Sequence, residues 1–309
     1  MRRRDAEPEP GLVAQLLQDQ APDLAENIVR PGTTTGSSNW VFRLGDELAV
    51  RLPRSDSYAD DLRTEIRWLP RLGPQLPVAV PRIVFEGEPS ARFPRPWAVV
   101  TWVPGQLPHD QTPSGQIQLA RSLAHFVRCL HAVDTWGESA GPERWGYRSG
   151  EPVTARIERW LLSAAHGLDD LFDPMRVHEA WRRLRDVPAP SRPPCWVHAD
   201  LSSENVLVGS TGELVGVIDF AGLGIGDHAV DFLYAWSLFE PTAREVFRVE
   251  SLADEATWRR ARAWAFVGPG LVTILNYRHA MPERTEKLIA MVEAVAAEVG
   301  VDLRPDPPS

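Results

Sequence analysis

Three polar side chains with the spacing of a reactive site lie between residues 198 and 219. Asp200 and Asn205 are five residues apart in one short run, and Asp219 follows after a second apolar segment. Phosphoryl transfer needs a carboxylate that orients and deprotonates a hydroxyl, and oxygen ligands that hold Mg²⁺ on the phosphates. We therefore interpret Asp200 as a general base, and Asn205 and Asp219 as magnesium ligands.

The segments between these residues explain how they could come together. Residues 206–208 and 214–218 are apolar and predict two strands, and the Gly-Ser-Thr-Gly run at 209–212 predicts the turn of a hairpin. A hairpin brings the end of its second strand close to the start of its first strand. Each polar residue alone is more often a turn cap or a strand end, but the combination of all three favours a site.

Composition narrows the class of protein. The 309 residues carry a net charge of −9, with 43% hydrophobic and 24% charged residues, which is typical of a soluble globular protein. The acidic balance argues against a nucleic-acid partner, and the short apolar runs argue against a membrane span. Two cysteines form no disulfide framework, and residues 1–10 lack the apolar stretch of a secretory signal, so we expect a cytoplasmic protein.

The basic residues have an unusual composition. Of the 33 lysine and arginine residues, only Lys287 is a lysine. Any chemistry that needs a cation elsewhere must therefore use arginine, and the two side chains are not interchangeable. None of the eight histidines has a metal-ligand spacing with Cys or Glu.

The first third of the chain predicts a sheet with one helix. Strands are expected at 26–30, 40–44, 48–52, 82–86 and 97–103, and a helix at 56–69. Glu65 borders the apolar face of that helix, where an unpaired charge is costly. Arg51, on the third strand, could pair with it, although an ordinary surface pair is the alternative.

The predicted secondary structure changes from strands to helices after Pro104-Gly105, a pair of residues that typically ends a strand or helix. Thr112 and Pro113 predict the N-cap and first turn of a long helix. Further helices are predicted at 153–166, 174–187, 231–239, 254–275 and 282–299. We therefore expect an N-terminal lobe of residues 1–104 and a C-terminal lobe of residues 105–309.

The motifs resemble those of the aminoglycoside phosphotransferase family, whose loop usually runs H-G-D-x4-N, followed by I-D-F and G-D-x3-D. This chain has His-Ala-Asp at 198–200, Asn205, Ile-Asp-Phe at 218–220 and Gly-Asp at 226–227 with Asp231; Ala199 is the departure within the loop. The resemblance implies an α+β, two-lobed protein-kinase-like fold. It comprises an antiparallel sheet plus a helix in the N-lobe and a mostly helical C-lobe.

The resemblance also implies roles for residues outside the loop. The third strand of kinase-like folds carries a lysine that pairs with a helix Glu and touches the nucleotide phosphates; here Arg51 and Glu65 take these places. The loop at 32–39 would cover the phosphates with Ser37 and Ser38, although a plain hairpin connection is the alternative. Thr101 and Val103 would bind the base through their backbone, and Asp231 would hold the catalytic loop.

We expect a Mg²⁺-dependent kinase that uses ATP or GTP to phosphorylate a hydroxyl of a small natural product, an antibiotic. Between residues 227 and 262 acidic and arginine residues are mixed, which is unlike a dedicated polycation site. Two alternatives stay open: a kinase of an amino sugar or choline-like alcohol, and a nucleotide-binding regulatory pseudokinase. A protein kinase is disfavoured, because no D-F-G or A-P-E run follows Asp219.

Overall fold

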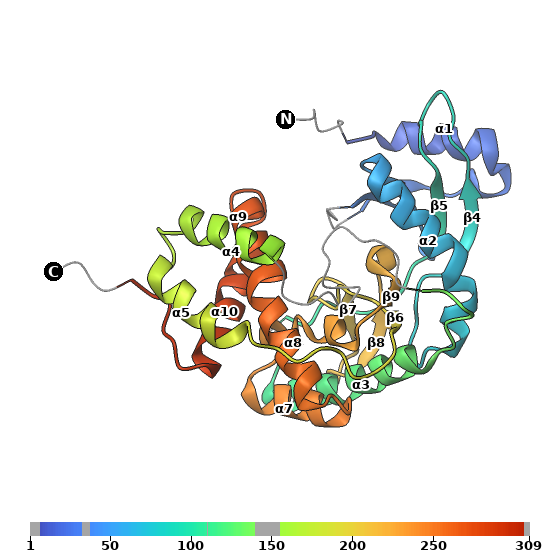
Figure 1. Ribbon diagram of the computed structural model, residues 1–309. Coiled ribbons are helices and arrows are strands. Elements are labelled where there is room, and N and C mark those ends of the chain that lie inside the picture. Colours follow the sequence, from blue (N-terminus) through green and yellow to red (C-terminus); the bar gives the residue numbers. More distant parts are fainter. Residues whose placement is uncertain (1–6, 33–37, 110, 140–154, 306–309) are drawn as a thin grey trace. The chain divides into compact units, whose positions relative to one another are not determined.

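The computed structural model describes residues 7–32, 38–109, 111–139 and 155–305 (Figure 1). The chain divides into two compact units. The first comprises residues 1–105 together with 215–223, and the second comprises residues 106–214 and 224–309. Each unit has its own secondary structure and its own buried residues, and together they give the mixed α+β class expected from the sequence.

The first unit is built on a five-stranded antiparallel sheet in the order β1-β2-β3-β5-β4. All five strands overlap the predicted ranges, although β1 begins three residues later than predicted and β5 ends two residues earlier. Their bounds are Val29–Pro31 for β1, Asn39–Leu44 for β2, Leu48–Pro53 for β3, Ile83–Gly87 for β4 and Trp97–Thr101 for β5.

A helix covers each face of this sheet. Helix α1 (Pro10–Gln20) packs Val13, Leu16 and Leu17 against the face that carries Val50 and Val99. Helix α2 (Asp56–Leu72) packs on the face that carries Ala49 and Ala98, and its N-cap Ser55 accepts the Tyr58 N–H. Because side chains alternate along a strand, Arg51 shares the face of Ala49 and is directed toward α2.

The segment 215–223 belongs to the first unit although it follows residues of the second. Its strand β8 (Leu214–Val217) bonds with Ala79 through two backbone hydrogen bonds, and the 3₁₀ turn η3 (Phe220–Gly222) packs on α2. Asp219 stands between the two, in a left-handed conformation with φ 58° and ψ 71°. The return of the chain therefore places Asp219 in the same unit as Arg51.

The second unit is mostly helical. Its α-helices are α3 (Pro113–Ala132), α4 (Ala155–Gly167), α5 (Pro174–Leu184), α6 (Ala235–Leu238), α7 (Pro241–Glu250), α8 (Glu255–Ala265), α9 (Thr273–Tyr277) and α10 (Pro282–Glu298). Helix α3 packs along α7, and Thr112 caps it as predicted by accepting the Gly115 N–H at 3.1 Å. Short strands β6 (Cys195–Val197) and β9 (Gly224–Gly226) pair antiparallel, and β7 (Val206–Val208) precedes the predicted turn.

Two helix predictions in this unit were wrong or incomplete, and one helix was not predicted. The single helix at 254–275 is interrupted by a π-helical segment (Phe266–Val272), where Pro269 supplies no N–H and Gly270 leaves helical geometry. The helix at 231–239 is instead a 3₁₀ turn η4 (His228–Phe232) followed by α6. Helix α7 was not predicted, because only Ala243 and Phe247 form its apolar stripe and Arg244 is buried with them.

No helix among the described residues is both long and apolar enough to cross a membrane.

Candidate active site

The loop that carries Asp200 is held in place by its own polar residues. The Asn205 amide donates to the Asp200 backbone oxygen at 2.8 Å and to its Oδ2 at 2.9 Å, and the Asp200 N–H donates to His198 Nδ1 at 3.2 Å. The other carboxylate oxygen of Asp200, Oδ1, is buried and has no hydrogen-bond partner among the described residues. One oxygen is therefore fixed, and the other is available to accept a proton.

A second carboxylate, Asp231, anchors the residues just before Asp200. Its Oδ1 accepts the Ala199 N–H at 2.7 Å, and its Oδ2 accepts the His198 N–H at 3.3 Å and contacts His131 Nε2 at 2.9 Å. The prediction that Asp231 holds the loop by hydrogen bonds is confirmed.

Ala199 is the residue at which the loop departs from the usual H-G-D run. Its φ is 64°, in the left-handed region where a Cβ is unfavourable and glycine is not. Ala199 is also buried. The alanine therefore adopts a conformation that glycine would adopt at lower cost.

Helix α10 supplies two cations to the same loop, and sequence analysis missed this contact. Arg284 forms an ion pair with Glu204 at 3.2 Å, and Lys287 donates to Ser203 Oγ at 3.3 Å. Burial lowers the pKa of Arg284, but interactions with Tyr234, Asp200 and Glu204 outweigh it and hold that pKa above its ordinary value. No local motif predicts this contact, because α10 lies far along the chain from the loop.

The first unit contains a buried arginine between two carboxylates. Arg51 Nη1 contacts Glu65 Oε2, and Arg51 Nη2 lies 3.0 Å from Asp219 Oδ1. The predicted pairing of Arg51 with Glu65 is confirmed, and the side chain of Glu65 is only 1% exposed. Burial raises the pKa of Glu65 to about 7, although the Arg51 charge opposes this rise.

The guanidinium group explains why arginine suits this position. Arg51 uses a different nitrogen for each carboxylate, which one lysine ammonium could not match in the same planar geometry. Ser38 Oγ lies 3.5 Å from Asp219 Oδ2 and belongs to the same cluster. Ser37 lies outside the described residues.

Thr101 and Val103 lie at the end of β5. The Thr101 N–H donates to the Arg82 oxygen at 2.9 Å, and its hydroxyl accepts the Arg82 N–H at 3.0 Å. The backbone of Val103 forms no hydrogen bond with another described residue. Of the two, Val103 therefore has the free backbone groups that could bind a base.

The predicted magnesium ligands have suitable donor atoms. Mg²⁺ prefers carboxylate and amide oxygens. The amide nitrogen of Asn205 donates to two oxygens of Asp200, and its amide oxygen is suited to bind a cation; the side chain of Asp219 is 29% exposed. Asn205 belongs to the second unit and Asp219 to the first. Asn205 and Asp219 thus each carry an oxygen atom that is suited to bind Mg²⁺.

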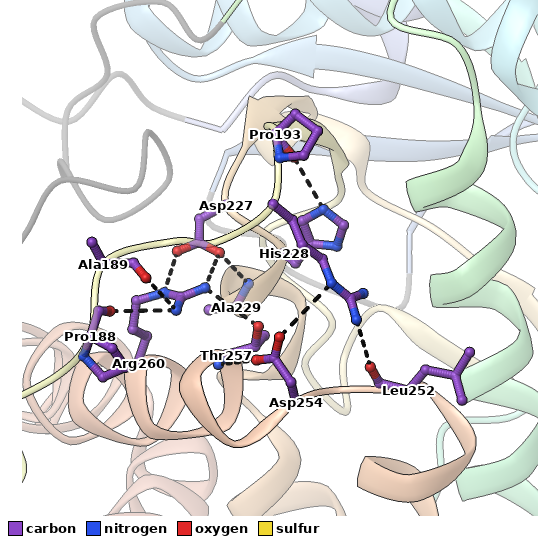
Figure 2. A network of polar contacts seen from close by, with 11 residues as sticks. Pro188, Ala189, Pro193, Asp227, His228, Ala229, Leu252, Asp254, Thr257 and Arg260 are labelled. Carbon is purple, nitrogen blue, oxygen red and sulfur yellow. Dashed lines mark hydrogen bonds and ion pairs between the residues drawn. The ribbon is translucent and has the colours of Figure 1, made fainter.

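A buried ion pair fixes the segment after β9 (Figure 2). Arg260 donates to Asp227 through Nε at 2.6 Å and through Nη2 at 2.8 Å, and both side chains are at most 3% exposed. Asp227 also accepts the Ala229 N–H at 3.0 Å, which caps η4. The Gly-Asp of the G-D-x3-D run is thus structural, and it positions Asp231 four residues later.

Comparison with solved structures shows the same fold. A structure of an APH(2″) enzyme with GDP and kanamycin matches with a TM-score of 0.69 and 22% identity, covering 93% of this chain and 98% of that one. A macrolide 2′-phosphotransferase from Brachybacterium faecium matches with a TM-score of 0.60 and 19% identity, covering 97% and 98%. These matches establish the two-lobed kinase-like fold of small-molecule phosphotransferases.

Sequence comparison places the chain within that class. An aminoglycoside 3′-phosphotransferase from Escherichia coli is 27% identical over 204 residues, which is 62% of this chain and 69% of the relative. The model of the phosphotransferase enzyme family matches residues 32–264. The chain belongs to this family and is a phosphotransferase.

The left-handed Ala199 predicts a stabilising substitution. Ala199→Gly should raise the free energy of unfolding by about 0.5–1 kcal/mol, because relief of the left-handed strain exceeds the extra entropy of glycine in the unfolded chain. Thermal unfolding measures the change.

Ala229→Gly is the matched control. Ala229 is also buried and also donates its N–H to an aspartate, but it has no positive φ. The control should lose stability. Equal losses in the two variants would contradict the assignment of strain to Ala199.

Proposed function

We propose that the protein transfers the γ-phosphate of ATP or GTP, with Mg²⁺, to a hydroxyl of a small natural-product antibiotic. Asp200 acts as the general base, Asn205 and Asp219 hold the metal, and Arg51 and Ser38 contact the phosphates. The backbone of Val103, with Thr101 beside it, binds the base, while Glu65 orients Arg51. The bound Mg²⁺ would neutralise charge on the phosphates.

The geometry of Asp200 carries this proposal. A general base needs a carboxylate oxygen that is held in position yet free to accept a proton. Asn205 holds Oδ2, Asp231 holds the preceding backbone, and Oδ1 has no partner among the described residues. An acceptor hydroxyl would supply the donor that Oδ1 lacks.

The comparisons support an antibiotic as the acceptor. Relatives that match this chain are named for aminoglycosides and macrolides, and those solved with nucleotides contain GDP, ADP or ATP. Several acidic residues between 227 and 262 are paired with arginine: Asp227 with Arg260, and Glu245 and Glu255 with Arg248. These pairs leave less negative charge for a polycation, so the assay panel should extend to uncharged and singly charged antibiotics.

Asp200→Ala should lower the rate of phosphoryl transfer by about 10²–10⁴, because positioned general-base catalysis contributes that much. Binding of the Mg²⁺–nucleotide should stay near that of the unsubstituted protein. Mass spectrometry of a panel of antibiotics and amino alcohols with either nucleotide measures transfer, and a fluorescent nucleotide measures binding.

Glu204→Gln is the matched control, since Glu204 is a carboxylate in the same loop and is 41% exposed. It should retain most of the activity. Unimpaired transfer by Asp200→Ala would refute the role of Asp200. Nucleotide binding without turnover of any acceptor would instead favour the regulatory pseudokinase.

Arg51→Lys should reduce kcat/KM for the nucleotide by about tenfold or more, because one ammonium replaces two directed hydrogen bonds to carboxylates. Steady-state kinetics over a nucleotide series measures the loss. Arg63→Lys, on the exposed side of α2, is the control and should have no effect. A fully active Arg51→Lys variant would show that positive charge alone is sufficient.

A further inference from the structure

Two histidines and a cysteine form a cluster in the second unit, apart from the residues assigned to phosphoryl transfer. His131 lies at the end of α3, Cys195 begins β6 and His228 begins η4. One ligand atom of each side chain lies within 4.8 Å of the others. Three separate elements thus bring together atoms that the sequence keeps far apart.

Each histidine is already oriented through one ring nitrogen. His131 Nε2 lies 2.9 Å from Asp231 Oδ2. His228 Nε2 lies 3.2 Å from the backbone oxygen of Pro193, a contact that Figure 2 shows. Because a carbonyl oxygen can only accept, His228 Nε2 carries the hydrogen, and in the neutral ring Nδ1 keeps its lone pair. A metal-binding histidine typically donates its other N–H to a carboxylate or carbonyl in this way.

The surroundings suit a cation. Cys195 is buried, and the side chain of His131 is 10% exposed. The Asp231 carboxylate, whose side chain is 0% exposed, contacts His131 and supplies a negative charge beside the cluster.

We propose that His131, Cys195 and His228 bind one zinc-class divalent ion, with Asp231 supporting His131. Two imidazoles and a thiolate match the preference of Zn²⁺ for nitrogen and sulfur ligands, and water would complete a tetrahedral site. Tetrahedral zinc places such atoms about 3.3–3.6 Å apart, so a pair of ligand atoms at the full 4.8 Å would close by about 1.2–1.5 Å. The Cys195 proton is released to solvent when the thiolate coordinates the ion.

The site has a structural consequence for the loop. Asp231 supports His131 and also accepts the Ala199 N–H, next to Asp200. An ion at the cluster would therefore fix His131, and through it the carboxylate that holds the loop. The proposed role is stabilisation of the second unit, independent of the acceptor and of the Mg²⁺–nucleotide.

Cobalt titration of the full chain, after treatment with a chelator and without nucleotide, tests the proposal. One equivalent of Co²⁺ should give a thiolate-to-metal charge-transfer band and the visible absorption of a tetrahedral ion, and excess Mg²⁺ should not remove them. Saturating Zn²⁺ should raise the Tm by about 3 °C or more. Calorimetry in buffers of different ionisation enthalpy should show the release of a proton.

Cys129 provides the matched control. Its Sγ lies 3.7 Å from His125 Nδ1 on helix α3, but the described residues place no third ligand beside this pair. Cys129→Ser should keep the cobalt band, whereas Cys195→Ser should lose it. His228→Gln, at a less buried position, should weaken cobalt binding by at least about tenfold and serves if Cys195→Ser fails to fold. Absence of the band in the unsubstituted protein, or its loss only with Cys129→Ser, would overturn the proposal.

Discussion

A buried carboxylate, Asp231, organises the second unit. Its side chain is fully buried, and a carboxylate in that setting is tolerated only if its oxygens are satisfied. The available donors are the backbone N–H groups of His198 and Ala199 and the ring of His131. The hydrogen bonds to Asp231 therefore fix the backbone just before Asp200. The proposed general base, Asp200, is thus positioned by contacts that stabilise the buried charge of Asp231.

The first unit also contains a buried charge that needs partners, the guanidinium group of Arg51. Arg51 is buried under α2, and Glu65 and Asp219 each pair with a separate nitrogen of its guanidinium. Asp219 can take part because the segment 215–223 returns to this unit. The proposed phosphate chemistry therefore does not need a lysine, because Arg51 takes that role. The one lysine of the chain, Lys287, lies in α10 and contacts Ser203.

Local patterns were sufficient to predict most of the first unit and part of the site. The alternation of side chains in β2, β3 and β5 predicts the sheet, and the same alternation places Arg51 opposite the helix face of Glu65. The apolar stripe of α7 is too sparse to predict a helix, and the π-helical segment depends on Pro269. Contacts from α10 to the loop, and the cluster of His131, Cys195 and His228, depend on tertiary packing that no local spacing encodes.

Asp219 in the first unit and Ala199 in the second unit both have left-handed backbones, but their side chains differ in what they contribute. Asp219 and Ala199 both have a φ near 60°, a conformation that costs a non-glycine residue about 1–2 kcal/mol. Asp219 cannot become glycine without losing the carboxylate that pairs with Arg51, so its strain is offset by an interaction of its own side chain. Ala199 contributes only its backbone N–H to Asp231, which glycine would also supply. Strain at Asp219 thus follows from the proposed chemistry, whereas strain at Ala199 does not.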